Sequence, residues 1–89
     1  MAKYLVVHPV GSDMDPDASR PMIKAIKANL TADAYWVRSC YPRESGKVFC
    51  EWNAKDAESI QQVLAKAWPD LPTEGIYKID MMLDSEDFR

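Results

Sequence analysis

The spacing of hydrophobic residues divides the chain into strand-like and helix-like segments. Residues 4–9 (YLVVHP) are rich in β-branched side chains and end before Gly11 and Ser12, so they predict a strand. Ser19 can cap a helix after it, with Pro21 tolerated in the first turn. The apolar residues of this helix recur near a helical period: Met22, Ile23, Ile26 and Leu30.

The middle of the chain predicts a β-hairpin. Residues 34–42 (AYWVRSCYP) and 47–52 (KVFCEW) read as strands joined by the turn RESG. If this turn is a four-residue loop, the paired residues are Arg38 with Glu51, Ser39 with Cys50, and Cys40 with Phe49. The opposite charges of the first pair support this register. The two thiols then point to opposite faces and cannot form a disulfide, so we expect Cys50 to be a small core residue.

The second helix is the clearest element of the sequence. Asp56 offers an N-cap, Glu58 lies in the first turn, and Pro69 and Pro72 end the helix. Its apolar residues fall on one face: Ile60, Val63, Leu64, Ala67 and Trp68. Residues 75–83 (GIYKIDMML) then predict a last strand.

The order of these elements, βαββαβ, predicts an α+β protein with the ferredoxin-like fold, in which two helices cover one face of a four-stranded antiparallel sheet. Right-handed crossovers place the first and third strands in the middle, and we expect their C-terminal ends to lie together. With 89 residues, the chain is a single domain, residues 1–89. A domain of this size gains stability from a partner subunit.

Composition excludes several function classes. The chain has 11 Lys and Arg against 14 Asp and Glu, a net charge of −3, and its basic residues are scattered, which argues against nucleic acid as a partner. The N-terminal apolar run is too short for a signal peptide or a membrane span, so we expect a cytoplasmic protein with reduced thiols. Two Cys and one His make an internal metal site improbable on composition alone.

The sheet face that the helices leave open is where we expect a site. Residues that we assign to this face include Tyr4, Val6, His8, Trp36, Arg38, Cys40, Phe49, Glu51, Lys78, Asp80 and Met82. Aromatic rings mixed with ionisable groups favour a homodimer through this face, with a pocket between the two sheets. A register slip of one residue would instead bury His8 in the core.

Six of these residues are the predicted ligand-binding set: His8, Trp36, Arg38, Cys40, Glu51 and Lys78. Arg38 would give bidentate contacts and Trp36 a stacking surface, which suits an anionic or aromatic small molecule. The favoured function is therefore a dimeric small-ligand-binding or regulatory protein. The alternatives are a cofactor-free enzyme of the dimeric α/β-barrel kind, with His8 and Glu51 as its acid–base pair, and a purely structural subunit.

Three stretches carry a resemblance to a known family: GKVFC (46–50), NAKDAESIQQVLAKA (53–67) and GIYKID (75–80). Over residues 4–80 the chain resembles a family of small bacterial and archaeal ferredoxin-fold proteins of unknown function, some of which bind nickel. The resemblance implies a homodimer with associated sheet faces. The nickel-binding members carry histidines at positions that are similar to Met22, Leu64 and Trp68 here, whereas His8 looks like a retained position. We therefore expect no cofactor and at most residual metal binding.

Overall fold

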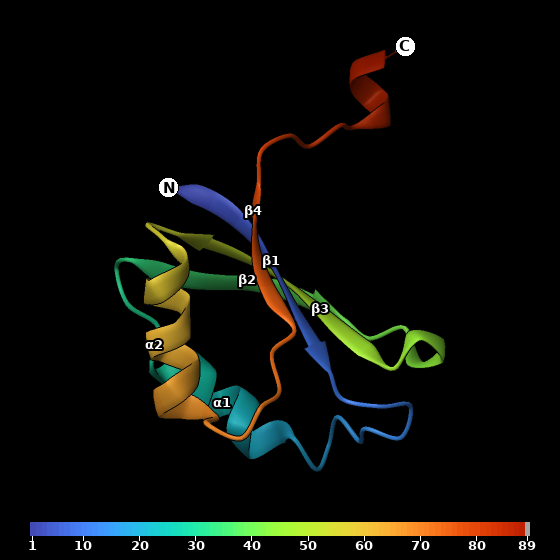
Figure 1. Ribbon diagram of the computed structural model, residues 1–89, viewed down its shortest axis with the longest axis vertical. Coiled ribbons are helices and arrows are strands. Elements are labelled where there is room, and N and C mark those ends of the chain that lie inside the picture. Colours follow the sequence, from blue (N-terminus) through green and yellow to red (C-terminus); the bar gives the residue numbers. More distant parts are fainter. Residues whose placement is uncertain (89) are drawn as a thin grey trace.

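The computed structural model describes residues 1–88 and contains one four-stranded sheet with two α-helices (Figure 1). Its elements are β1 (Ala2–Pro9), α1 (Arg20–Ala28), β2 (Ala34–Cys40), the short 3₁₀ helix η1 (Arg43–Ser45), β3 (Lys47–Ala54), α2 (Ala57–Ala67), β4 (Gly75–Ile79) and the 3₁₀ helix η2 (Ser85–Phe88). The strand order β2-β3-β1-β4 confirms the predicted ferredoxin-like topology. Neither described helix has the length and apolarity that crossing a membrane requires.

The β2–β3 hairpin has the predicted register. Arg38 lies opposite Glu51, Ser39 opposite Cys50 and Cys40 opposite Phe49. Gly46 ends the turn with a φ of 68°, a left-handed conformation that glycine adopts without strain. The pairing is interrupted by a bulge between Trp36 and Arg38. Because of this bulge, Trp36 and Arg38 face opposite sides of the sheet although they are two residues apart.

The two central strands are antiparallel, which corrects one expectation. Pro9 at the end of β1 lies opposite Lys47 at the start of β3, so the C-terminal ends of β1 and β3 are far apart. The reason lies in the connections. A helical crossover makes β2 parallel to β1, and the hairpin then turns β3 antiparallel to β2 and so to β1.

The assignment of β1 to the open face was also wrong. Tyr4, Val6 and His8 lie opposite Trp52, Cys50 and Val48, on the side that the helices cover. Apolar residues stand at successive positions of β1, so the alternation that normally identifies the buried face is missing there. The buried core includes Val6, Trp52, Ile60 and Val63, each at most 1% exposed.

The two helices begin in different ways. The Asp56 carboxylate accepts a hydrogen bond from the Ser59 backbone N–H at 2.8 Å, as predicted for an N-cap. Hydrogen bonds from the Ser59 side chain and backbone lower the pKa of Asp56. Ser19 occupies the N-cap position of α1 but makes no capping side-chain hydrogen bond. Ser19 is nevertheless buried, with 7% of its surface exposed.

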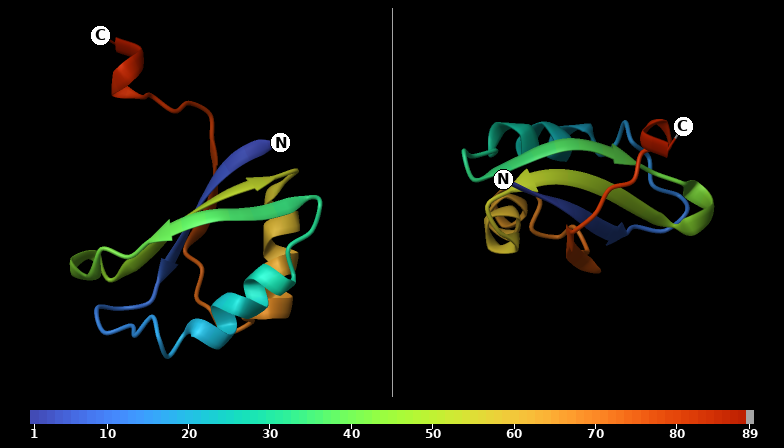
Figure 2. Two further views of the ribbon diagram at one scale, coloured as in Figure 1. Left: turned by 180° about the vertical axis from the view of Figure 1, so that it is seen from behind. Right: turned by 90° about the horizontal axis from the view of Figure 1, so that it is seen from above.

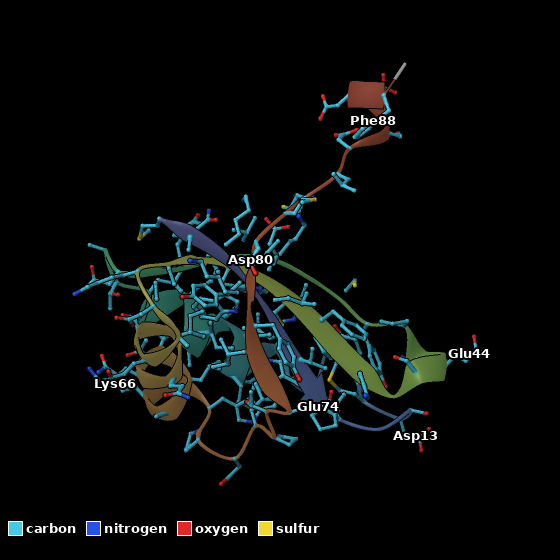
Figure 3. The ribbon with its side chains drawn as sticks, turned by 45° about the horizontal axis from the view of Figure 1, so that its top comes forward. Asp13, Glu44, Lys66, Glu74, Asp80 and Phe88 are labelled. Atoms are coloured by element: carbon cyan, nitrogen blue, oxygen red, sulfur yellow. The ribbon has the colours of Figure 1, made fainter. Side chains whose placement is uncertain are left out.

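The chain beyond β4 leaves the body of the domain. The strand predicted over residues 75–83 ends at Ile79, which pairs with Lys3, because β1 extends only one residue further in that direction. The following segment extends away from the sheet in Figure 1 and in the left view of Figure 2, and it ends near Phe88, labelled in Figure 3. Its apolar side chains are exposed.

Candidate functional site

A cavity of about 170 Å³ lies on the helix-covered side of the sheet, between α1 and the end of the β2–β3 hairpin. The sheet contributes His8, Trp36, Val48 and Cys50 to its wall, α1 contributes Ile23 and Ile26, and the chain after α2 contributes Trp68 and Leu71. None of the described residues that line it is Lys, Arg, Asp or Glu. The cavity is thus mainly apolar and aromatic, as small-molecule sites usually are.

Two loops held together by hydrogen bonds close one side of this cavity. The loop after β1 contributes Met14, and the end of the hairpin contributes Tyr41. The Tyr41 hydroxyl donates to the carbonyl of Gly11 and accepts from the N–H of Met14. Arg43 donates to the carbonyls of Ser12 and Met14. Figure 3 shows Asp13 and Glu44, which mark these two loops, at the same end of the molecule.

His8 is the one histidine of the chain, and its side chain is fixed at the cavity wall. The residue is 2% exposed, and its Nδ1 lies 3.0 Å from the carbonyl oxygen of Pro72 and 3.2 Å from the Thr73 hydroxyl. A carbonyl only accepts, so Nδ1 carries the proton. Burial lowers the pKa of His8 below its ordinary value of 6.5, and the hydrogen bond to Pro72 partly opposes this effect. His8 is therefore neutral at pH 7.

A chain of hydrogen bonds connects three other residues of the cavity wall. The Trp36 indole N–H donates to the Ser39 hydroxyl at 2.8 Å, and this hydroxyl donates to the sulfur of Cys50 at 2.9 Å. Burial raises the pKa of the Cys50 thiol, while the hydrogen bond from Ser39 acts in the opposite direction. A buried thiol of this kind is protonated at neutral pH and is a poor nucleophile.

The open face carries a separate cluster of charges. Glu51 accepts from Arg38 and from Lys3, each at 3.3 Å, and Lys3 also donates to Asn53 at 3.2 Å. The Arg38 side chain is 75% exposed. Water and salt screen such pairs, so they contribute little to stability.

The structure divides the six predicted ligand-binding residues into separate groups. His8, Trp36 and Cys40 line the cavity. Arg38 and Glu51 pair with each other on the opposite face. Lys78 is exposed on the edge strand β4, opposite Tyr4. The single polar cluster that the sequence predicted is therefore wrong, and His8 and Glu51 cannot form an acid–base pair because the sheet separates them.

Sequence reasoning missed several residues of the cavity. Ser19 was assigned only a capping role, and Met14 and Tyr41 lie outside the periodic segments on which the face assignments depended. The pairing of strands β1 and β3 is what brings these positions together. No local pattern encodes that pairing, although the apolar residues Ile23, Ile26 and Trp68 and the predicted core residue Cys50 did indicate a buried surface here.

Two helices over one face of an antiparallel sheet in the order β2-β3-β1-β4 define a ferredoxin-like α+β protein. Within this class, residues 4–79 match the family described as nickel responsive protein SCO4226-like, and the chain belongs to this family. The crystal structure of SCO4226 from Streptomyces coelicolor A3(2) superimposes with a TM-score of 0.76 at 18% sequence identity, over 92% of this chain and 100% of that one. Comparison with curated proteins gives no match.

The side chains of this chain do not fit a nickel site within one copy. Across residues 1–88, no group of three or more His, Cys, Asp or Glu side chains is placed to hold a metal ion. His8 has its Nδ1 bonded to Pro72, and Cys50 is hydrogen bonded to Ser39. A nickel ion needs several nitrogen, oxygen or sulfur ligands at once. The expectation of weak or absent metal binding remains a prediction.

We expect calorimetric titration of the untagged protein with Ni²⁺ to show no stoichiometric site of sub-micromolar affinity, because too few ligands converge. A His8→Asn variant and the wild type should give the same weak response. A tight, stoichiometric site in the wild type would contradict this expectation. If the His8→Asn variant abolished that site, His8 would be one of its ligands. The other ligands would then have to come from a second copy of the chain, because too few converge within one copy.

A second prediction concerns the dependence of stability on pH. The pKa of His8 is lower in the folded state than in the unfolded chain, so His8 is still neutral in the folded state at a pH where the unfolded chain is already protonated. The unfolded state then binds more protons, and the free energy of unfolding therefore rises with pH. This stability is fully present above pH 6.5 and is lost as the pH falls toward the lowered pKa of the folded state. We expect a slope of at most about 1.4 kcal/mol per pH unit, the limit for one proton.

Urea denaturation between pH 7.5 and 5 measures this slope. His8→Asn keeps an N–H that can donate to Pro72 but cannot titrate, so its stability should be nearly independent of pH just below 6.5. Equal slopes for the wild type and the variant would show that His8 is not the group responsible.

Proposed function

We propose that this protein is a non-catalytic binding or regulatory protein that holds a small, uncharged and largely apolar molecule in the cavity beside His8. The observation that carries the proposal is the cavity itself, with about 170 Å³ of space behind two tied loops. An apolar cavity of about 150 Å³ is large enough to bind benzene. The space is thus suited to a molecule of about one aromatic ring.

The lining residues favour an aromatic ligand over the anionic one that the sequence also suggested. Trp36, Trp52 and Trp68 supply aromatic surface, and no cationic side chain lies among the described lining residues. Arg38, the residue that we expected to bind an anion, lies on the other face with Glu51. An anion in this cavity would lose its hydration without gaining a partner charge.

Two features favour binding over catalysis. The Cys50 thiol is buried and has a raised pKa, so it is not an activated nucleophile. His8 and Glu51, the acid–base pair of the enzyme alternative, lie on opposite faces of the sheet. The family description as nickel responsive agrees with a regulatory role for its members. A cytoplasmic location, which the sequence predicts, belongs to the same proposal.

Filling the cavity should abolish ligand binding. Val48 lines the cavity on β3, and Val48→Phe adds a ring there without removing a hydrogen bond. Val37→Phe is the matched control, since Val37 is 38% exposed and lies outside the cavity wall. We expect phenol, followed by changes in amide chemical shifts, to bind Val48→Phe at least about tenfold more weakly than Val37→Phe, a loss of roughly 1.4 kcal/mol. Equal binding by both variants, or no binding to the wild type, would refute the cavity as the site.

We also propose that the protein forms a homodimer through its open sheet face, with a different set of residues from the one first expected. Trp36 belongs to the helix-covered side, opposite Trp52. The apolar side chains of the open face are instead Leu5, Phe49, Tyr77 and Ile79. The Tyr77 ring lies against Gly75, which pairs with Val7, and Val7 is only 4% exposed although it faces this side. Apolar side chains on a sheet face that no helix covers are typical of an interface.

A charge at the centre of the open face should weaken the dimer. Leu5→Glu places a carboxylate opposite Glu51, where it would be buried without a cation of its own in the dimer. Gln62→Glu makes the same charge change on the exposed face of α2. In sedimentation at micromolar concentration, the wild type and the Gln62→Glu variant should each form a dimer. The dissociation constant of the Leu5→Glu dimer should be at least about tenfold higher than theirs. A monomeric wild type of 10.1 kDa would overturn the dimer proposal.

A further inference from the structure

We propose that the cavity selects a neutral ligand with a hydrogen-bond donor, such as a hydroxyl on a small ring, which donates to Nε2 of His8. This inference rests on the proposed function, because it names the chemical class that the same cavity binds. It goes beyond that function by assigning a recognition atom and by excluding ligands that only accept hydrogen bonds.

Most polar groups around the cavity are already satisfied within the chain. The Trp36 N–H donates to Ser39, and the Ser39 hydroxyl donates to Cys50. The Tyr41 hydroxyl both donates to Gly11 and accepts from Met14. These groups have no strong hydrogen-bonding capacity left that would orient a ligand.

Two polar groups of the wall remain unused. Among the hydrogen bonds of residues 1–88, none involves Nε2 of His8 or the hydroxyl of Ser19, although both residues line the cavity and are at most 7% exposed. Within the described chain, the Trp52 indole nitrogen alone is a completely buried side-chain polar atom without a partner. The Nε2 atom is therefore not sealed by protein atoms, and the space it reaches is the cavity.

The hydrogen bond on the other ring nitrogen fixes what Nε2 can do. Because Nδ1 donates to the Pro72 carbonyl, the neutral ring carries its lone pair on Nε2, which is then an acceptor. Nδ1 points toward the segment before β4, because its contacts there are Pro72 and Thr73. Nε2 is on the opposite edge of the ring and faces the cavity that His8 lines. The Ser19 hydroxyl can donate or accept, so it offers a second contact to a ligand hydroxyl.

Selectivity follows from the cost of leaving this acceptor unpaired. A ligand that fills the cavity with apolar atoms strips Nε2 of water and gives it no partner, which is unfavourable in a low-dielectric site. A ligand of the same size with a hydroxyl restores the bond. Sites built around such a buried polar group discriminate strongly against analogues that lack the matching group.

The test compares phenol, anisole and toluene as probes on the wild-type protein, with dissociation constants from chemical-shift titration. The three have similar size, but only phenol donates a hydrogen bond. We expect phenol to bind at least about tenfold more tightly than anisole. Equal affinities for phenol and anisole would overturn the donor requirement and leave the cavity proposal standing, whereas no binding of any probe would overturn both.

Variants of His8 identify the recognition atom. His8→Asn retains an N–H near the Nδ1 position for Pro72 but has no acceptor at Nε2, so it should bind phenol and anisole alike. His8→Gln places an amide group near the Nε2 position and should recover part of the preference for phenol. If His8→Asn kept the full preference, Nε2 would not be the acceptor. Ser19→Ala, which disturbs no hydrogen bond of the described chain, gives the same readout for the second contact.

Discussion

The antiparallel pairing of β1 with β3 determines where every candidate functional residue lies. Val6 opposite Cys50 and His8 opposite Val48 place four side chains on the helix-covered side. The same register leaves Leu5 and Glu51 on the open face. A slip of one residue would exchange the two sets, because side chains alternate between faces. The cavity and the charge cluster are therefore two consequences of one register.

The bulge in β2 is the second constraint, and it separates residues that the sequence places together. Without it, Trp36 and Arg38 would share a face, because they are two residues apart. The extra residue lets Trp36 reach the core side, opposite Trp52, while Arg38 still meets Glu51. Trp36 can then donate to Ser39 at the cavity wall. One inserted residue thus turns a predicted mixed cluster into an aromatic wall and a solvent-exposed ion pair.

The sequence predicted the fold well because its signals are local. The period of α2, its Asp56 cap and the charge pair of Arg38 with Glu51 each act within a short stretch, and all three are found in the structure. The face of β1 could not be predicted in this way. Leu5 and Val7 are as apolar as Tyr4 and Val6, so the choice between them depends on the distant partners in β3 and α2. Because the site depended on that choice, His8 was assigned to the open face, whereas it lines the cavity on the other side of the sheet.

Neutral His8 shows how the same packing can serve both stability and recognition. The pairing that buries it also brings Pro72 within hydrogen-bond distance, which satisfies one ring nitrogen and sets the tautomer. If His8 served packing alone, we would expect either a hydrogen-bond partner for Nε2 or an apolar residue at this position. An unpaired acceptor in an apolar wall is costly. The Trp52 N–H is sealed and cannot gain a partner without rearrangement, whereas Nε2 of His8 borders open space. A ligand in the cavity can therefore complete the hydrogen bonding of His8 but not that of Trp52.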